Sequence, residues 1–215
     1  MNIVCIGAHP DDPEWYAGAA MAQWARAGHR VLSLALTNGD IGHHLMAGGV
    51  LAQRRAAESK RSAERAGIRS LVLDNHDGEL MPTLDLRRQV VRIIRNERAN
   101  LVLTHRPWDY HPDHRYTSVA VQDAAFMVTV PNFCPDTPAL EKNPVFLYMM
   151  DTFQKPLPFQ PDLVLDVDGA MDVKWAMLDA MASQMYEWLP WLERLPGTVP
   201  ETPEARLEYL RNLGL

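Results

Sequence analysis

The chain has 215 residues, of which 47% are hydrophobic and 22% charged, and its formal net charge is −6. This length suits one substantial domain, so we expect residues 1–215 to form a single domain. The negative charge and the lack of any Lys/Arg block argue against binding to nucleic acid or to an acidic membrane. No apolar run approaches the ~20 residues needed to span a bilayer, and no secretory signal is recognisable. The two cysteines, Cys5 and Cys134, are expected to be unpaired thiols of a cytoplasmic protein.

Strand and helix patterns alternate through the first half of the chain. We expect strands at 2–7, 29–36, 71–73 and 101–104, and helices at 14–27, 47–66 and 84–98. Gly28 and Gly67 follow two of these helices, and Thr83 precedes the third as a cap. The alternation predicts an α/β fold with a Rossmann-like, doubly wound, mostly parallel sheet and helices on both faces. The active site of such a fold lies at the carboxyl ends of the strands.

The second half of the chain is less regular. Residues 131–161 are rich in proline and carry few helical cues, so we expect a long excursion that contains one strand, at 145–150. A further strand is expected at 163–167 and a helix at 170–185. Two roles stay open for the excursion and for the Trp-rich tail after it, completing a pocket or pairing subunits in a homo-oligomer.

Two clusters of His and Asp follow two of the predicted strands. Ala8-His9-Pro10-Asp11-Asp12 comes after the first strand, and His111-Pro112-Asp113-His114 comes after the fourth strand and before a helical stretch. In a doubly wound sheet the functional crevice opens at the carboxyl ends of the strands, where the strand order reverses, commonly between the first and fourth strands. The topology therefore predicts that the two clusters meet in one site.

Imidazole nitrogens and carboxylate oxygens suit Zn²⁺, and a catalytic zinc site has three protein ligands and one open position. His9, Asp12 and His114 would make such a set. Fe²⁺ and Co²⁺ stay open as alternatives, because sites built from His and Asp accept several metals.

The remaining members of the two clusters suit acid–base roles. Asp11 lies beside a ligand and would accept the proton of a metal-activated water. His111 would protonate a leaving group or support an oxyanion. Asp113 would orient His111 or a ligand imidazole from behind.

Other polar and aromatic residues are expected near the same crevice. His43 and His44 lie in the loop after the second strand, either as substrate contacts or as a solvent-facing pair. Trp108 and Tyr110 precede the second cluster, either as an apolar wall for a sugar ring or as loop packing. His105 is expected to be structural, exposed or placed behind a ligand.

The two clusters resemble the two signatures of the PIG-L family of metal-dependent N-acetylglucosaminyl deacetylases, also called LmbE-like proteins. Thr37-Asn38-Gly39-Asp40, Arg55 followed by Glu58, and Asp77-Gly78 are similar to further family positions. The resemblance implies a zinc hydrolase that removes an acetyl group from an N-acetylated sugar, a small-molecule substrate. The residues and the resemblance agree on the site, whereas the acetyl amide and the sugar come from the resemblance.

By motif position, the resemblance implies specific roles. It makes His9, Asp12 and His114 the metal ligands, and Asp11 the general base. His111 would match the histidine that stabilises the tetrahedral intermediate. Arg55 and Asp77 would fall where family members contact sugar hydroxyls.

The sequence leaves three alternatives to this function. The first is hydrolysis of another amide, such as a mycothiol- or bacillithiol-type conjugate or a modified natural product. The second is a metal-binding module without turnover, which the predicted open coordination position disfavours. The third is a Rossmann-type nucleotide binder, which the missing G-x-G-x-x-G pattern disfavours.

Overall fold

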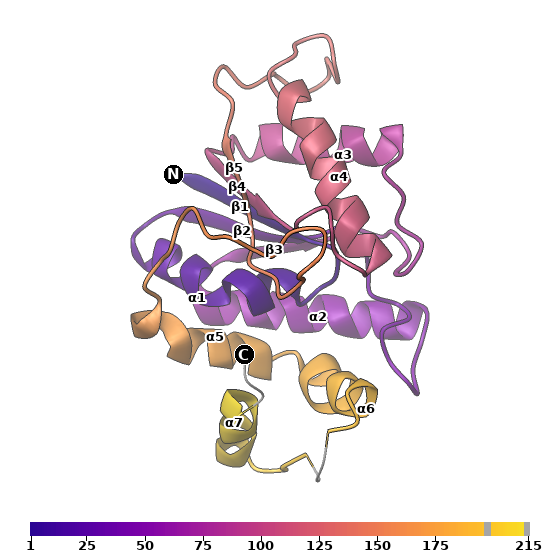
Figure 1. The fold of residues 1–215 in the computed structure, drawn as a ribbon, viewed down its shortest axis with the longest axis vertical. Helices are drawn as coiled ribbons and strands as arrows, with labels where there is room; N and C mark the ends of the chain where they lie inside the picture. Colours follow the sequence, from indigo (N-terminus) through magenta and orange to yellow (C-terminus); the bar gives the residue numbers. More distant parts are fainter. Residues whose placement is uncertain (196–198, 213–215) are drawn as a thin grey trace.

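The computed structural model describes residues 1–195 and 199–212, and its centre is a five-stranded sheet (Figure 1). The strands are β1 (Asn2–Gly7), β2 (Arg30–Ala35), β3 (Arg69–Val72), β4 (Leu101–Thr104) and β5 (Val145–Tyr148). Their order across the sheet is β3-β2-β1-β4-β5, and each neighbouring pair is parallel. The order reverses between β1 and β4, so the switch point at which a site was predicted is present in the topology.

The side chains of β1 alternate between two hydrophobic cores, as a strand buried on both faces requires. Val4 and Ile6 pack on one face with residues of α3 (Leu84–Asn96) and α4 (Pro112–Met127). Ile3 and Cys5 pack on the other face with residues of α1 (Asp12–Arg26) and α5 (Met171–Asp179). Figure 1 shows the helices as layers on opposite sides of the sheet, with α2 (Gly49–Ala66) beside α1. The predicted α/β class with helices on both faces is confirmed.

The predicted elements of the first half are confirmed, with boundaries that shift by one or two residues. The Thr83 hydroxyl caps α3 by accepting a hydrogen bond from the Leu86 amide at 3.2 Å, as expected. One shift bears on function, because α1 begins at Asp12 rather than at Glu14 and so includes a predicted metal ligand.

A buried arginine holds the far end of α4 in place. Arg95, on α3, is 2% exposed, and its guanidinium donates hydrogen bonds to six main-chain carbonyl oxygens. The acceptors are the carbonyls of Met127, Val128, Val130, Phe133, Cys134 and Thr137. These bonds attach the last turn of α4 and the start of the proline-rich excursion to α3.

The predicted single helix at 170–185 is wrong. A 3-10 turn (Asp168–Ala170) leads into α5, which ends at Asp179, and a π-helical segment, η2, follows at Ser183–Trp188. The break has a physical cause on α2, because Glu58 accepts hydrogen bonds from both the amide and the hydroxyl of Ser183, at 3.1 and 2.5 Å. The short helices α6 (Leu189–Leu192) and α7 (Pro203–Asn212) complete this C-terminal region.

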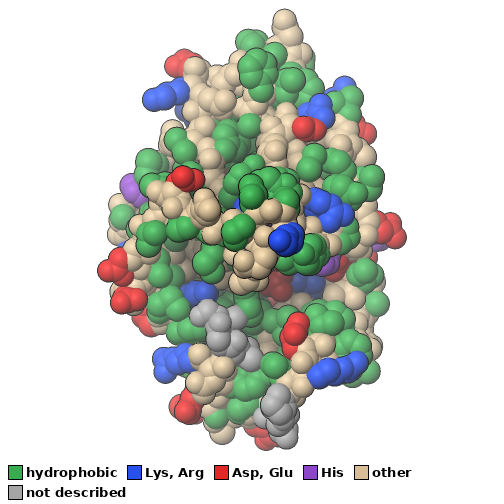
Figure 2. Space-filling model, viewed as in Figure 1, with side chains coloured by type: hydrophobic (Ala, Val, Ile, Leu, Met, Phe, Trp, Pro, Cys, Tyr) green, Lys and Arg blue, Asp and Glu red, His purple; other side chains and the backbone are tan. Residues whose placement is uncertain are grey.

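The predicted strand at 163–167 is also wrong. The described sheet ends at β5, and the carbonyl of Asp166 accepts a hydrogen bond from Gln23 of α1, so this segment crosses a helix instead of extending the sheet. The side chains of Leu163, Val164 and Leu165 are consequently exposed, with Val164 at 86%. Figure 2 shows hydrophobic side chains gathered at the centre of this face, where the chain between β5 and α5 crosses in front of the sheet in Figure 1. Within the described residues, no helix combines the length and the apolar character needed to cross a membrane.

Candidate metal centre and active site

The turn after β1 folds the Asp12 carboxylate back over the strand end. Its Oδ2 accepts hydrogen bonds from the amides of Ala8 and His9, at 2.9 and 2.7 Å. The approach is so close that a Cβ on Gly7 would lie 2.6 Å from the Cβ of Asp12, so glycine is needed there. Asp11 takes the N-cap position of α1, but its side chain makes no capping hydrogen bond. Its Oδ1 instead accepts a hydrogen bond from Arg55 at 3.0 Å, which favours a role other than capping.

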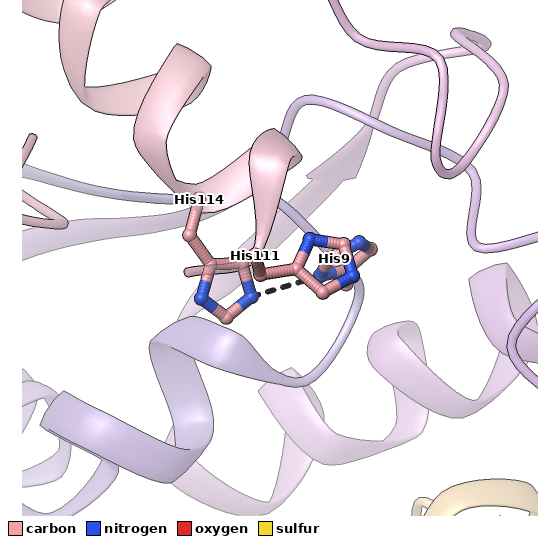
Figure 3. A group of neighbouring side chains, drawn as sticks. All are labelled: His9, His111 and His114. Atoms are coloured by element: carbon pink, nitrogen blue, oxygen red, sulfur yellow. Dashed lines mark hydrogen bonds between the residues drawn. The ribbon is translucent and has the colours of Figure 1, made fainter. Parts of the chain in front are cut away.

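The second cluster forms the start of α4. His111 is the N-cap residue, and its Nδ1 accepts a hydrogen bond from the Asp113 amide at 3.3 Å. The other ring nitrogen, Nε2, therefore carries the proton of the neutral imidazole. His114 lies in the first turn of α4, and Figure 3 shows His111 and His114 reaching from this helix start toward His9. The two clusters meet, as the topology predicted.

One ring nitrogen of each predicted ligand histidine and the two carboxylate oxygens of Asp12 lie close together, at nearly equal distances. His9 Nδ1 lies 3.1 Å from His114 Nε2 and 3.3 Å from Asp12 Oδ2, and His114 Nε2 lies 3.3 Å from Asp12 Oδ1. Tetrahedral zinc with bonds of about 2.0–2.1 Å would place its ligand atoms about 3.3–3.4 Å apart. The residues present therefore fit a zinc-like cation, both in their chemistry and in their spacing.

Further side chains of ligand type border the same point. Three overlapping groups lie close enough to hold a metal: His9/His111/His114, Asp12/His105/His114 and His9/Asp77/Asp113. Asp113 is fully buried, accepts hydrogen bonds from the Gly78 and Leu80 amides, and has Oδ2 3.4 Å from His9 Nε2. Its carboxylate thus lies behind the ligand His9, whereas His111 is contacted by the backbone of Asp113 alone.

The charges of the site are strongly coupled. Burial opposes ionisation of Asp12, but the imidazoles of His114 and His105 hold its pKa well below the ordinary value. Against the effect of burial, Asp12 and Asp109 raise the pKa of His114 to about 9. Without a metal this histidine therefore holds a proton at neutral pH, and a cation binding there must displace it.

Asp11 differs from its neighbour Asp12. Burial raises the pKa of Asp11 above its ordinary value, even though the Arg55 guanidinium and the nearby imidazoles oppose the shift. A carboxylate with a raised pKa that is not tied up as a ligand is suited to accept a proton.

Two predicted substrate-binding residues lie beneath the site. Arg55 has a side chain only 3% exposed and donates hydrogen bonds to Asp11 and to the Gly39 carbonyl. Asp77 Oδ1 lies 3.0 Å from His9 Nε2, and Asp77 Oδ2 lies 3.6 Å from Arg55 Nη1. Both residues support the ligand and the predicted base directly.

The other three predicted substrate-binding residues lie farther out. His43 Nε2 is bonded to Glu187 of η2 at 2.9 Å, and the ring of His44 stacks on Trp191 at 5.0 Å between centroids. Both histidines therefore turn toward the C-terminal region. Tyr110 is 70% exposed beside His111, and its ring contacts Phe153 at 4.7 Å between centroids.

Phe153 belongs to the proline-rich excursion, which is fastened to the loop that leads to His111. Arg106, 5% exposed, donates hydrogen bonds from Nε and Nη2 to the Asp151 carboxylate at 2.6 and 2.5 Å. It donates another to the Leu157 carbonyl at 3.1 Å. The excursion thus borders the site from the β4 side.

Two further residues contact the predicted metal ligands. The sequence left open a position behind a ligand for His105, and it did not indicate Asp109. His105 Nε2 lies 3.2 Å from Asp12 Oδ2, and the ring of His105 stacks on that of His114. Asp109 Oδ2 lies 2.8 Å from His114 Nδ1. His105 follows β4 directly and Asp109 lies in the loop between β4 and α4. Their place after the carboxyl end of a central strand, which also indicated the two clusters, is the sequence signal that points to them.

Comparison with known proteins identifies the family of the chain. The model of the family PIG-L, described as GlcNAc-PI de-N-acetylase, matches residues 4–125, which contain both clusters. The diacetylchitobiose deacetylase of Thermococcus kodakarensis is 31% identical over 205 residues, covering 90% of this chain and 76% of that protein. The chain belongs to the PIG-L family. The 4-oxalmesaconate hydratase of Pseudomonas putida is 24% identical over 195 residues, covering 87% of this chain and 75% of that protein.

Solved structures show the PIG-L fold in the same form. The N,N'-diacetylchitobiose deacetylase from Pyrococcus horikoshii superposes with a TM-score of 0.77 at 23% identity, covering 90% of this chain and 76% of that one. The hydratase GalB from Pseudomonas putida KT2440 gives the same TM-score at 22% identity, covering 100% and 90%. The α/β fold is therefore shared by relatives whose names describe two kinds of chemistry.

Proposed function

We propose that this PIG-L protein is a metal-dependent hydrolase that removes an acetyl group from an N-acetylated sugar or sugar conjugate. The observation that carries the proposal is the close approach of donor atoms on His9, Asp12 and His114, with Asp11 beside them and hydrogen-bonded to Arg55. The choice of a sugar as the substrate rests on the 31% identity to a diacetylchitobiose deacetylase. Zinc is the metal we propose, with Fe²⁺ and Co²⁺ as the other candidates.

When bound, the metal supplies a Lewis acid that lowers the pKa of a water molecule and polarises the acetamide carbonyl. Asp11 takes the proton of that water on Oδ2, because Arg55 occupies Oδ1. Arg55 thereby fixes the direction in which the base points.

His111 stabilises the negative charge that develops on the carbonyl oxygen. Its Nδ1 is occupied by the Asp113 amide, so the Nε2–H is the free donor. Burial and the neighbouring His9 and His114 lower the pKa of His111, which keeps the ring neutral and Nδ1 an acceptor. The water oxygen bonds to the carbonyl carbon as Asp11 takes the proton. The C–N bond then breaks, the amine leaves with the proton that Asp11 took from water, and acetate is released.

The finer assignments are predictions of the same proposal. Tyr110 is the exposed aromatic residue beside His111, and we propose that it packs against the sugar ring. Arg55, Asp77, His43 and His44 stay predicted substrate contacts. A cytoplasmic location, a single domain, a homo-oligomer and no binding to nucleic acid or membrane also stay predictions.

Hydration is the second candidate function. The observation that favours it is the 24% identity to a hydratase over 87% of the chain. A site that activates water suits addition to a carbon–carbon double bond as well as attack on an amide. Hydrolysis of a thiol-conjugate amide and metal binding without turnover are further outcomes of the test.

The test is acetate release from a panel of N-acetylated sugars, chitooligosaccharides and thiol conjugates. Protein is assayed as purified, after chelation, and after zinc, iron or cobalt is added back, with 4-oxalmesaconate as the hydratase substrate. We expect metal-dependent acetate release from an N-acetylated sugar. Hydration of the unsaturated acid without acetate release from any compound would overturn the proposal.

A further inference from the structure

Asp109 lies in the loop between β4 and α4 and is 5% exposed. Both of its carboxylate oxygens are engaged by the second cluster. Oδ1 accepts a hydrogen bond from the His111 amide at 2.8 Å, and Oδ2 lies 2.8 Å from His114 Nδ1. The Asp109 carbonyl accepts a third bond from Arg115 at 2.8 Å. This residue therefore connects the loop with the first turn of α4 at three points.

The contact with His114 has a chemical consequence. An ionised carboxylate only accepts hydrogen bonds, so the proton of the neutral His114 ring must lie on Nδ1. The lone pair of Nε2 then points at Asp12 Oδ1 and His9 Nδ1, 3.3 and 3.1 Å away. We infer that Asp109 is a positioning residue that holds His114 in the tautomer able to bind the metal through Nε2. The inference rests on the metal centre of the proposed function, and no catalytic step is assigned to Asp109.

The ring of His114 is also held in its plane. His105 stacks on it with centroids 4.2 Å apart and an angle of 10° between the rings. His105 is itself buried, with Tyr16 packed edge-on against it at 5.7 Å. Rotation of the His114 ring about its Cβ–Cγ bond would break both this stack and the bond to Asp109. The orientation of Nε2 is therefore set before a metal arrives, which is the usual function of a carboxylate behind a ligand histidine.

The substitution Asp109→Asn tests the tautomer with the smallest change in shape. The amide oxygen is needed at the Oδ1 position, because the His111 amide donates to it. The amide NH₂ would then take the Oδ2 position and donate to Nδ1 of His114. This bond favours the opposite tautomer, with a proton on Nε2 where the metal binds. Loss of a carboxylate behind a ligand typically lowers metal affinity about 10–100-fold.

The experiment measures the zinc dissociation constant of the full chain by competition with a chromophoric chelator. We expect the zinc dissociation constant of Asp109→Asn to rise about 10–100-fold. The control Asp162→Asn, which changes an exposed carboxylate just after the excursion, should match wild type. The thermal midpoint of the metal-free variant should stay near that of metal-free wild type, which separates a positioning role from a general loss of structure. Unchanged zinc affinity in a folded Asp109→Asn would overturn the inference.

A second measurement needs no variant. In the zinc-loaded wild-type protein, ¹⁵N NMR of the imidazoles distinguishes the metal-bound nitrogen from the protonated one. We expect His114 to be bound through Nε2 and protonated at Nδ1, and binding through Nδ1 would contradict the inference even if Asp109→Asn fails to fold. Neither measurement uses an amide substrate, so the inference and the proposed deacetylation can fail independently.

Discussion

Asp11 and Asp12 are adjacent carboxylates with opposite electrostatic environments. Burial raises the pKa of Asp11, whereas the imidazoles around Asp12 lower that of Asp12 against the effect of burial. This separation of the two pKa values indicates that Asp11 is a proton acceptor and that Asp12 stays an anion.

The substitution Asp11→Asn should therefore abolish the base and spare the metal. We expect turnover to fall by about 10²–10⁴-fold with the zinc content unchanged, because the donor atoms on His9, Asp12 and His114 are untouched. Metal analysis and acetate release on the same preparation check this. Turnover close to wild type would remove Asp11 as the base.

Glu14 predicts a pH dependence of stability. It is fully buried in α1 beneath the site, and burial raises its pKa to about 7 although Ser33 donates a hydrogen bond to it at 2.6 Å. Because the folded-state pKa exceeds the unfolded value, this group favours folding most at low pH, and the contribution is lost as the pH rises through about 7.

The matched comparison is Glu14→Gln, which keeps the shape and removes the titration. Between pH 5.5 and 8 the variant should gain about 2 kcal/mol in unfolding free energy relative to wild type. Denaturant unfolding of both metal-free proteins at the two pH values measures this. A constant difference would show that Glu14 does not titrate in this range.

The residues of the site were predictable to different degrees. His9, Asp12 and His114 belong to short motifs at strand ends, and topology alone brings strand ends together. The contacts behind these ligands were not predictable, because the paths of the loops that carry Asp77 and Asp109 depend on tertiary contacts. The sequence likewise does not reveal that Arg55 is buried against Asp11, since charged positions on a helix are usually solvated.

Among the elements, those of the first half were predicted well because their hydrophobic period agrees with their place in the sheet. The prediction of a strand at 163–167 was wrong because local hydrophobicity cannot show whether a sheet has room for another strand. The prediction of one helix at 170–185 was wrong because Glu58, more than a hundred residues earlier, accepts hydrogen bonds from Ser183. Both errors come from contacts that are distant in sequence.

Arg95 provides a prediction for the α3–α4 layer. Lysine has three donors on one atom and cannot reproduce a planar guanidinium that reaches six carbonyls. Arg95→Lys should lower the unfolding free energy by about 2–4 kcal/mol, as measured by denaturant titration. The control is Arg92→Lys on the same helix. The Arg92 side chain is 38% exposed and pairs with Asp136, so a change below about 1 kcal/mol is expected. Equal effects in the two variants would contradict the role of Arg95.

At the scale of the whole molecule, metal binding should stabilise the fold. The ligands come from opposite sides of the switch between β1 and β4, so only the folded chain brings them together. Zinc at a hundredfold excess over its Kd adds about 2.7 kcal/mol, which should raise Tm by about 5–10 °C in a chain of this size. Thermal unfolding with zinc and with chelator measures the shift. The shift should disappear in His114→Ala, and a shift that persists there would place the metal elsewhere.

The proposed function depends most on where the metal binds, and anomalous diffraction from crystals of the zinc-loaded protein measures that position. We expect one peak about 2.0–2.3 Å from His9 Nδ1, the Asp12 carboxylate and His114 Nε2, with Asp11 outside the coordination sphere. A peak bound by His105 in place of His9, or one coordinated by Asp11, would contradict it.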